Sequence, residues 1–100
     1  MKLVFSTAAE ADLEAIGDYI ALENPLRAVS YIREIRGKCM ELREMPEAFP
    51  PVPHHEATGI RRRVHGNYLI FYRIHEQAVE IIRVLHGSMD YRHLIVSDEE

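Results

Sequence analysis

Hydrophobic residues in the first half of the chain recur every three or four positions, which is the period of an α-helix. The first series consists of Ala9, Leu13, Ile16 and Ile20. The second series consists of Ala28, Ile32, Ile35, Cys39 and Leu42. Each series gives one apolar stripe along one face of a helix. The pattern therefore predicts two amphipathic helices, and a short strand at residues 2–5 precedes the first of them.

Polar residues mark where these two helices begin. Thr7 and Glu10 have the spacing of a capping box, with Thr7 as the N-cap and Glu10 reaching back to it. Asn24 before Pro25 is the second start signal, because asparagine caps helices and proline is tolerated at the first helical position. The break between the helices is short, so we expect an antiparallel hairpin whose second helix ends near Met45.

The second half of the chain alternates with the period of a β-strand. Three runs predict strands at residues 60–64, 68–74 and 79–85. Short polar turns at residues 65–67 and 75–77 separate them, so the strands should be antiparallel neighbours. The sequence therefore predicts a β-meander after the two helices.

Alternation also assigns each apolar side chain of the last two strands to a face. One face would carry Tyr68, Ile70, Tyr72 and Ile82. The other face would carry Leu69, Phe71, Ile81 and Leu85. Because both faces are apolar, the sheet must be covered on both sides. We expect the helical hairpin to cover one face and a partner or a loop to cover the other.

These elements predict an α+β fold in which a short N-terminal strand precedes an antiparallel helical hairpin packed on a mainly antiparallel sheet. Residues 46–59 contain four prolines and no periodicity, so we interpret them as an extended surface connection. One hundred residues are the length of one domain, which we place at residues 1–97. Residues 98–100 form an acidic tail.

The composition is that of an ordinary soluble protein, with 47% hydrophobic and 28% charged residues. No apolar run approaches the roughly 20 residues that a membrane-spanning helix needs. The single cysteine, Cys39, cannot form an internal disulfide, which fits a reducing compartment. We therefore expect a cytoplasmic protein without a membrane partner.

Charge is distributed unevenly along the chain, whose net charge is −4. Residues 59–97 carry six arginines against three acidic residues, a local charge of +3. So small a basic excess suits a locally acidic partner. It is too small for general binding to duplex DNA, which depends on many phosphate contacts. We expect no direct sequence-specific binding of nucleic acid by this chain alone.

The arginines of the meander are its most conspicuous polar residues. Alternation places Arg61 and Arg63 on one face of the first strand and Arg62 on the other. They fit either a solvated edge strand protected by charge or a partner surface. A turn about Glu76 would place Arg73 and Arg83 on one face.

Arg83 interrupts an apolar run in an inner strand, where a guanidinium left buried and unpaired would be costly. One interpretation is a structural ion pair with Glu80, Asp90 or an acid of a helix. The other is a role toward a partner. Both remain open at the level of sequence.

The histidines do not predict a metal site. His54-His55-Glu56 lacks the spacing of a zinc motif, and no cysteine or glutamate completes a set around His86, Asp90 and His93. There is no glycine-rich phosphate loop and no nucleophile elbow. We expect no metal and no cofactor, and the chain has no standard enzyme signature.

Four short motifs of the second half stand in a defined order: Gly59-Ile60-Arg61, Gly66-Asn67-Tyr68, Tyr72-Arg73-Ile74 and Arg83-Val84-Leu85-His86-Gly87. Behind an N-terminal strand, a helical hairpin and a proline-rich connection, this order resembles the ParE toxins of the RelE/ParE superfamily. The resemblance covers essentially the whole chain, and the last two motifs are the specific ones. The turn Gly87-Ser88-Met89-Asp90 departs from it, since the family more often has an arginine there.

The resemblance implies a toxin of a type II toxin–antitoxin system, with roles in plasmid stabilisation and growth arrest. A ParD-like antitoxin would wrap the helices and the sheet, which suits a sheet whose second face the chain itself leaves uncovered. The free toxin would inhibit DNA gyrase and would not be an enzyme. The alternatives are a RelE-like, ribosome-dependent mRNA interferase and an inactive toxin kept as an antitoxin-binding module.

The resemblance also suggests site residues. For the antitoxin these are Ile20, Ile32, Arg61, Arg63, Tyr68 and Phe71, with acidic partner side chains near the arginines. For the target they are Arg73, Arg83, His86 and Asp90. The interferase alternative would use Arg61, Arg83, His86 and Tyr91. It is weakened because the only lysines, Lys2 and Lys38, lie outside the meander.

Overall fold

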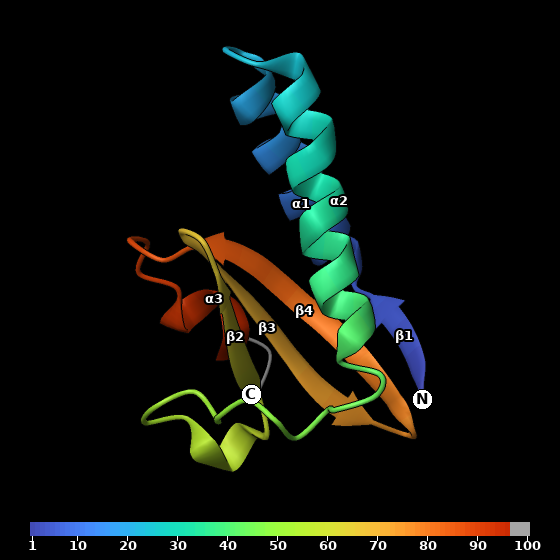
Figure 1. The fold of residues 1–100 in the computed structure, drawn as a ribbon. Helices are drawn as coiled ribbons and strands as arrows, with labels where there is room; N and C mark the ends of the chain where they lie inside the picture. Colours follow the sequence, from blue (N-terminus) through green and yellow to red (C-terminus); the bar gives the residue numbers. More distant parts are fainter. Residues whose placement is uncertain (97–100) are drawn as a thin grey trace.

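A computed structural model describes residues 1–96 of the chain. The elements follow the predicted order. They are β1 (Lys2–Phe5), α1 (Thr7–Ala21), α2 (Pro25–Glu41), β2 (Arg61–His65), β3 (Tyr68–His75), β4 (Ala78–His86) and α3 (Arg92–Val96), with a short 3-10 helix at Glu56–Thr58. The predicted acidic tail lies outside the described residues. Figure 1 shows the long hairpin of α1 and α2 rising from a curved sheet.

The four strands form one sheet in the order β1-β4-β3-β2. β2, β3 and β4 are antiparallel neighbours, as the sequence predicts, and β1 runs parallel to β4. β1 pairs with β4 only as far as Phe5 opposite Ile81. Beyond that point α1 lies along the edge of β4, where Ser6 and Asp12 bond the backbone of Ile82 and Val84. Side chains at the start of α1 thus form hydrogen bonds with backbone groups of β4 that have no neighbouring strand to bond them.

The first helix begins one residue earlier than predicted. Ser6, and not Thr7, is the N-cap, because its backbone is extended and its Oγ accepts a hydrogen bond from the N–H of Ala9 at 3.0 Å. The same hydroxyl donates to the carbonyl of Ile82 at 2.7 Å, which fixes the helix start on the sheet. Glu10 points to the second helix and does not reach back to the cap.

The start of the second helix is confirmed. Asn24 Oδ1 accepts a hydrogen bond from the N–H of Arg27 at 3.0 Å, and Pro25 occupies the first turn. The α-helix ends at Glu41, somewhat before the predicted end near Met45. Turns continue the chain through Glu44 toward the proline-rich connection.

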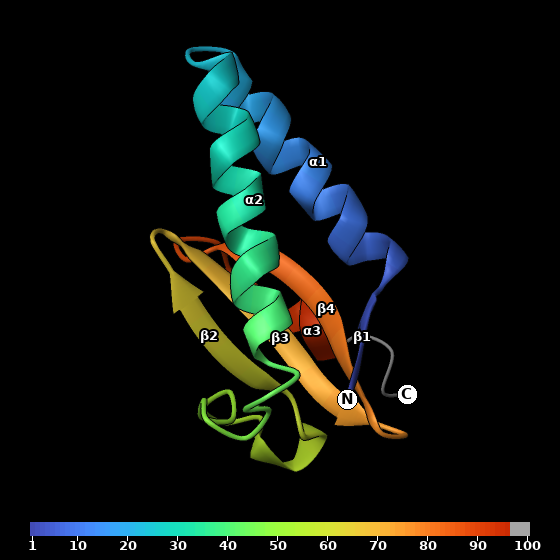
Figure 2. The ribbon, with the colours of Figure 1, turned by 45° about the vertical axis from the view of Figure 1, so that its right-hand side comes forward.

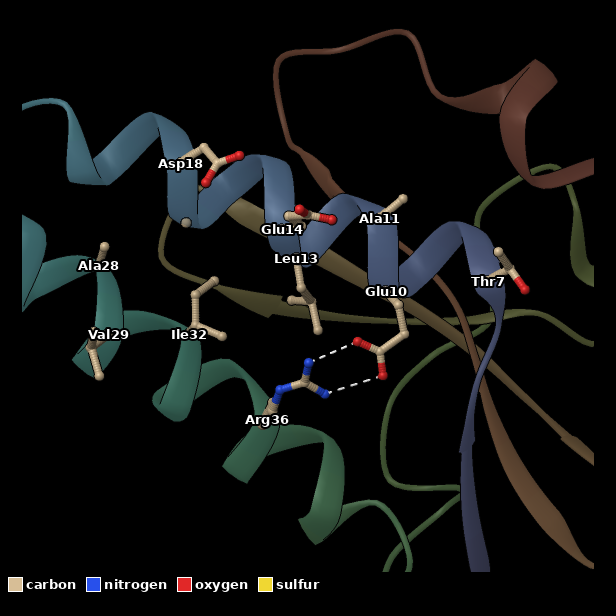
Figure 3. Close-up of a pocket in the computed structure, with 11 residues that line it drawn as sticks. Thr7, Glu10, Ala11, Leu13, Glu14, Asp18, Ala28, Val29, Ile32 and Arg36 are labelled. Carbon is tan, nitrogen blue, oxygen red and sulfur yellow. Dashed lines mark hydrogen bonds and ion pairs between the residues drawn. The ribbon is translucent and has the colours of Figure 1, made fainter.

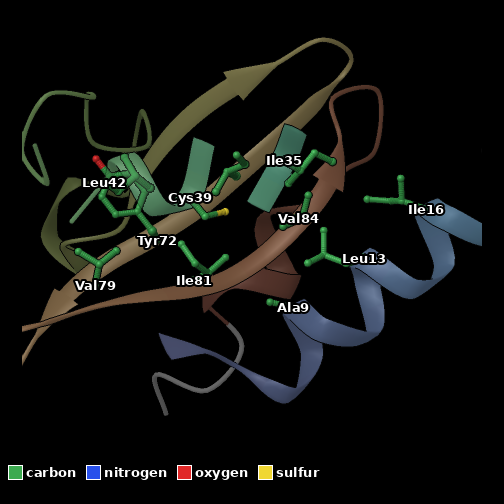
Figure 4. Packing of buried hydrophobic residues seen from close by; sticks show 11 residues of the cluster. Ala9, Leu13, Ile16, Ile35, Cys39, Leu42, Tyr72, Val79, Ile81 and Val84 are labelled. Atoms are coloured by element: carbon green, nitrogen blue, oxygen red, sulfur yellow. The ribbon is translucent and has the colours of Figure 1, made fainter. Parts of the chain in front are cut away.

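The main core lies between the helical hairpin and one face of the sheet (Figure 4). The helices contribute Ala9, Leu13, Ile16, Ile35 and Cys39. The sheet contributes Ile70, Tyr72, Val79, Ile81 and Val84. Each large aliphatic side chain buried there stabilises the fold by roughly 1.5–3 kcal/mol. These residues come from the start of α1 and the end of α2, so the loop end of the hairpin projects beyond the sheet (Figure 2).

The second face of the sheet is covered by the chain itself. A second apolar cluster contains Val52, Ile60, Leu69, Phe71, Leu85 and Ile95. Val52 comes from the proline-rich connection and Ile95 from α3, which lies on the side of the sheet opposite the hairpin (Figure 2). The expectation of a loop is therefore right, and the expectation that this face awaits a partner is wrong.

An irregularity in β4 corrects the predicted assignment of faces. Tyr72 pairs with Ile81, whereas its neighbour Phe71 pairs with Arg83, so Ile82 is an extra residue in a β-bulge. As a result Ile81 packs with the helical hairpin and Ile82 packs with the second cluster, the reverse of the simple alternation. Strict alternation cannot anticipate a bulge, because one inserted residue exchanges the two faces.

Candidate partner-binding site

Two of the three arginines on β2 hold the connection between α2 and β2. Arg61 donates to the carbonyl oxygens of Phe49 at 2.6 Å and Glu47 at 3.3 Å. Arg63 donates to the carbonyl of Lys38 at 3.0 Å, and its guanidinium lies over the ring of Phe49. The two side chains share one face, as alternation predicts, and this is the face that the hairpin covers. Their hydrogen-bonding capacity is directed at this chain's own backbone.

The other sheet arginines also have partners within the chain. Arg62 lies on the opposite face and donates to the hydroxyl of Tyr91 at 2.9 Å. Arg73 pairs with Glu80 at 2.9 Å, the residue opposite it on β4. The first contact joins the C-terminal segment to the sheet, and the second joins β3 to β4.

Arg83 forms the structural ion pair that the sequence left as one alternative. Its Nε and Nη2 bond the two carboxylate oxygens of Asp12 at 2.8 and 2.9 Å. Asp12 lies on α1, so the partner is an acid of a helix and neither Glu80 nor Asp90. The hydrogen bonds that Arg83 donates to Asp12 raise the pKa of Arg83, although partial burial acts in the opposite direction. The Arg83 guanidinium therefore keeps its positive charge.

The four residues of the interferase alternative are not brought together. Arg61 contacts the proline-rich connection, and Arg83 contacts α1. Tyr91 packs on Phe71 on the second face, with ring centroids 4.7 Å apart. His86 lies beside Tyr68 at the end of β4. Each has different neighbours, and no hydrogen bond joins any two of them within residues 1–96.

A groove of about 690 Å³ runs between α1 and α2 on the outer side of the hairpin (Figure 3). Leu13, Gly17 and Ile32 lie between the two helices there. A Cβ atom added at Gly17 would stand 3.4 Å from Ile32, so the glycine keeps this part of the groove open. The groove therefore offers a mainly apolar floor on a part of the hairpin that the sheet does not cover.

The rim of this groove is acidic along α1. Glu10 pairs with Arg36 across the groove at 2.7 Å, and the bond lowers the pKa of Glu10 (Figure 3). Glu14 and Asp18 follow on the same helix and are exposed. Neither forms an ion pair within the described residues 1–96. Two uncompensated carboxylates thus border an apolar floor.

A second concavity of about 600 Å³ lies where the hairpin meets the ends of β3 and β4. This cleft is lined by Tyr19, Ile20, Arg27, Tyr31, Asn67, Tyr68 and His86. Tyr68 packs edge-on against His86 at 5.2 Å, and the guanidinium of Arg27 lies over the ring of Tyr31. Desolvation raises the pKa of both Tyr31 and Tyr68, so their hydroxyls remain protonated. The cleft therefore combines aromatic walls with hydrogen-bond donors.

The described residues contain no obvious centre for metal or thiol chemistry. Among residues 1–96, no three side chains of His, Cys, Asp or Glu converge in a way that could hold a metal ion. Burial raises the pKa of the Cys39 thiol to about 12, which makes it an unreactive core residue. None of the helices in this part of the chain combines the length and apolar character needed to cross a bilayer.

Comparison with known proteins identifies the family. Residues 3–91 match the family described as the ParE toxin of type II toxin-antitoxin system, parDE. The chain is also 38% identical over 88 residues to Toxin ParE1 of Caulobacter vibrioides. The aligned residues cover 87% of this chain and 90% of that protein. The chain belongs to the ParE toxin family of type II toxin–antitoxin systems. The resemblance inferred from the four motifs is thus confirmed.

Two solved structures share the fold of this toxin. One is from the chromosomal ParDE TA system of P. aeruginosa, with a TM-score of 0.72 and 24% identity over 86% of this chain and 95% of that chain. The other is from the toxin-antitoxin complex RelBE2 of Mycobacterium tuberculosis, with a TM-score of 0.63 and 24% identity over 85% and 95% of the two chains. These likenesses confirm the predicted α+β fold.

The structure distributes the predicted antitoxin-binding residues over different surroundings. Ile32 lines the groove, and Ile20 and Tyr68 line the cleft. Phe71 is fully buried beneath the C-terminal segment, so the free toxin does not present it. Arg61 and Arg63, also predicted for this role, bond the backbone of Phe49 and Lys38 and so hold the proline-rich connection in place. We call these two arginines the clamp on the proline-rich connection.

The residues predicted to bind the target are equally dispersed. Arg73 and Arg83 are held in ion pairs with Glu80 and Asp12. His86 lines the cleft. Asp90 lies in an exposed loop and pairs with Arg92, whose hydrogen bond lowers the pKa of Asp90.

Sequence reasoning missed the acidic rim of the toxin's groove and the helix α3. The rim could have been found, because Glu10, Glu14 and Asp18 are four residues apart on one predicted helix. Helix α3 also left a signal, since Tyr91, Leu94 and Ile95 have apolar i, i+3, i+4 spacing. Asp12 could not have been singled out, because its partner is 71 residues away.

Proposed function

We propose that this toxin is neutralised by a ParD-like antitoxin and that, when free, it inhibits DNA gyrase. Membership of the ParE family supports the antitoxin part of the proposal, since the family is that of the parDE systems, and the resemblance to ParE toxins implies gyrase as the target. A proteinaceous target also suits the chain's charge. A net charge of −4 disfavours binding to phosphate-rich RNA or DNA.

The observation that carries the proposal is the use of the sheet arginines. Every arginine of β2, β3 and β4 bonds an acid, a carbonyl or a hydroxyl of this chain. Cleavage of RNA needs positive charge free to stabilise a phosphate in the transition state. Strands β2, β3 and β4 contain no lysine to supply it, and the lysine of the sheet is Lys2 at the start of β1. An inhibitor that acts by binding a protein does not need such a cluster.

The groove between α1 and α2 is the surface that we assign to the antitoxin. Its apolar floor at Leu13 and Ile32 suits the apolar face of an amphipathic helix. The uncompensated Glu14 and Asp18 favour basic side chains beside that face. This replaces the expectation of acidic antitoxin residues near Arg61 and Arg63, because Arg61 already bonds two carbonyl oxygens of this chain and Arg63 already pairs with Glu41.

Gyrase inhibition can be tested with toxin made by cell-free synthesis, which avoids its effect on growing cells. Addition of the toxin in stoichiometric excess should block supercoiling of relaxed plasmid by purified gyrase or trap cleaved DNA. The protein encoded by the adjacent open reading frame, mixed with the toxin beforehand, should restore supercoiling. Unaffected gyrase at excess toxin would overturn this target.

Induced expression in cells separates the alternatives. Growth arrest with a DNA-damage response is the expected outcome, and it should be absent when the adjacent open reading frame is co-expressed. Primer extension on translated messages should reveal no cuts at the ribosomal A site. If such cuts appear, the toxin is an interferase. If a complex forms but growth is never arrested, the chain is an inactive antitoxin-binding module.

A further inference from the structure

The cleft at the junction of the hairpin and the β3–β4 ends differs chemically from the groove. No carboxylate lines it, whereas the groove is bordered by Glu10, Glu14 and Asp18. Its polar groups are one guanidinium, one amide, one imidazole and three phenols. In a protein of net charge −4, a concavity without acids is a distinct local environment.

The imidazole of His86 presents its Nε2–H group as a donor, because a hydrogen bond within the turn after β4 engages its other nitrogen. Its Nδ1 lies 3.1 Å from the backbone N–H of Ser88, which can only donate. Nδ1 is therefore the acceptor, and the neutral ring carries its proton on Nε2. The Nε2–H has no hydrogen-bond partner within residues 1–96. The side-chain amide of Asn67 and the hydroxyls of Tyr19 and Tyr68 are also without partners in that range.

The walls of the cleft are aromatic. Tyr31 and Tyr68 have ring centroids 6.0 Å apart with an interplanar angle of 59°. The guanidinium of Arg27 lies 4.9 Å from the Tyr31 centroid, and it also pairs with Glu34 outside the cleft. Tyrosine and arginine are among the residue types enriched at the energetic centres of protein interfaces.

We propose that this cleft binds an acidic anchor of the antitoxin, formed by an aromatic side chain and an adjacent carboxylate. The ring of the anchor packs against Tyr31 and Tyr68, and the carboxylate accepts hydrogen bonds from Asn67 and His86. The inference rests on the proposed function, because it takes the anchor to be part of the antitoxin. It adds a second site of opposite polarity, because the groove favours basic side chains and the cleft favours an acidic one.

Charge decides between a peptide and a nucleic acid as the occupant. One aromatic–carboxylate pair brings a single negative charge, which the donors of the cleft can accommodate. An oligonucleotide brings one charge per phosphate and would approach Glu23, which lines a neighbouring concavity that shares Tyr19, Ile20 and Arg27 with the cleft. The single guanidinium of Arg27 already has an acidic partner and adds little attraction for a polyanion.

The test uses ¹⁵N-labelled toxin and two blocked dipeptides, acetyl-Phe-Asp-amide and acetyl-Phe-Asn-amide. The acidic dipeptide should produce saturable shifts of the Asn67, Tyr68 and His86 resonances. The amide dipeptide should bind about ten-fold more weakly, since it loses charge-assisted hydrogen bonds. Equal affinities, or shifts that are not confined to the cleft, would overturn the proposal.

A matched pair of variants places the charge effect in the cleft. Asn67→Asp introduces a carboxylate there and should weaken binding of the acidic dipeptide by about ten-fold. Gln77→Glu makes the same charge change in the β3–β4 turn at the other end of the strands and should leave it unchanged. Unchanged binding by the Asn67 variant would contradict the proposal. Tighter binding of a thymidine tetranucleotide at the cleft would replace it with a nucleic-acid site.

The outcome is separable from that of the proposed function. If the dipeptide does not bind but the antitoxin still forms a neutralising complex, only the anchor cleft is refuted. If no antitoxin complex forms at all, the proposed function fails whatever the dipeptide does.

Discussion

Asp12 on α1 and Arg83 on β4 are 71 residues apart and form a two-pronged ion pair, with N–O distances of 2.8 and 2.9 Å. Oδ2 of Asp12 also accepts the backbone N–H of Val84 at 2.9 Å. The carboxylate therefore does two things. It neutralises a partly buried guanidinium, and it bonds the edge of β4 beyond the end of β1.

Replacement of Asp12 should destabilise the toxin more than any surface charge. In Asp12→Asn the guanidinium of Arg83 loses its counter-ion while its side chain remains only 21% exposed. We expect the free energy of unfolding to fall by about 2–3 kcal/mol. Urea unfolding followed by circular dichroism measures it.

A second substitution distinguishes the pair from the helix. Asp12→Asn combined with Arg83→Met removes the stranded charge and should recover part of the loss. Glu14→Gln changes an exposed acid on the same helix and should stay within about 0.5 kcal/mol of the unmodified chain. A double variant no more stable than Asp12→Asn would show that the ion pair is not the cause.

The clamp on the proline-rich connection gives a second prediction. Arg63→Met keeps an aliphatic stem over Phe49 but loses the bonds to Lys38 and Glu41. We expect a loss of about 1–2 kcal/mol in the free energy of unfolding. Arg33→Met, at an exposed arginine of α2, is the control and should have almost no effect. If Arg63→Met retains full stability and weakens only the antitoxin complex, this arginine is a partner contact after all.

Local signals in the sequence were enough to predict most of the fold. The helical series, the Asn24-Pro25 start and the alternating strands depend on residues close together in the chain, and each appears where it is expected. The bulge at Ile82 was not predictable from local alternation, because it is a property of the pairing between β3 and β4 and of the packing on both faces of the sheet. The N-cap at Ser6 depends on a contact with Ile82 far along the chain.

The site was less predictable than the fold for the same reason. Alternation correctly separated Arg62 from Arg61 and Arg63, but it could not show that all three bond this chain's own atoms. A charged side chain on a strand has the same local pattern whether it faces a partner or a neighbouring loop. Only the three-dimensional course of residues 46–59 and of the C-terminal segment distinguishes these cases.

The cover on the second face provides a third prediction. Ile95 of α3 packs into the cluster around Phe71 and Leu85, so Ile95→Asp would place a carboxylate among apolar side chains. We expect α3 to detach, the fluorescence of a hydrophobic dye to rise and the free energy of unfolding to fall by about 2–3 kcal/mol. Met89→Asp, at an exposed position of the same segment, should do neither. Dye fluorescence equal to that of the unmodified toxin would contradict the packing.

The ion pair across the groove makes stability depend on pH. The hydrogen bond from Arg36 lowers the pKa of Glu10 from its usual value of 4.5, so unfolding takes up a proton in the acid range. The stabilisation is complete above pH 4.5 and is lost as the pH falls through the folded-state pKa. Both side chains are about half exposed, so we expect Glu10→Gln to cost only about 0.5 kcal/mol at pH 7, and this cost should shrink as the pH falls through the folded-state pKa of Glu10. Glu14→Gln should show no such dependence, and a constant difference for Glu10→Gln would refute the linkage.

The acidic rim should act mainly on the rate of antitoxin binding. Glu14 and Asp18 border the groove without ion-pair partners within residues 1–96, and rim charges steer approaching molecules more than they hold them. Glu14→Lys with Asp18→Lys should lower the association rate constant with the antitoxin by about ten-fold at low salt, and the difference should shrink as salt is added. Glu44→Lys with Glu47→Lys changes the same charge at exposed positions outside the groove and is the matched control. Surface plasmon resonance at two ionic strengths measures both rates, and equal rates for the two double variants would mean that the antitoxin binds elsewhere on the toxin.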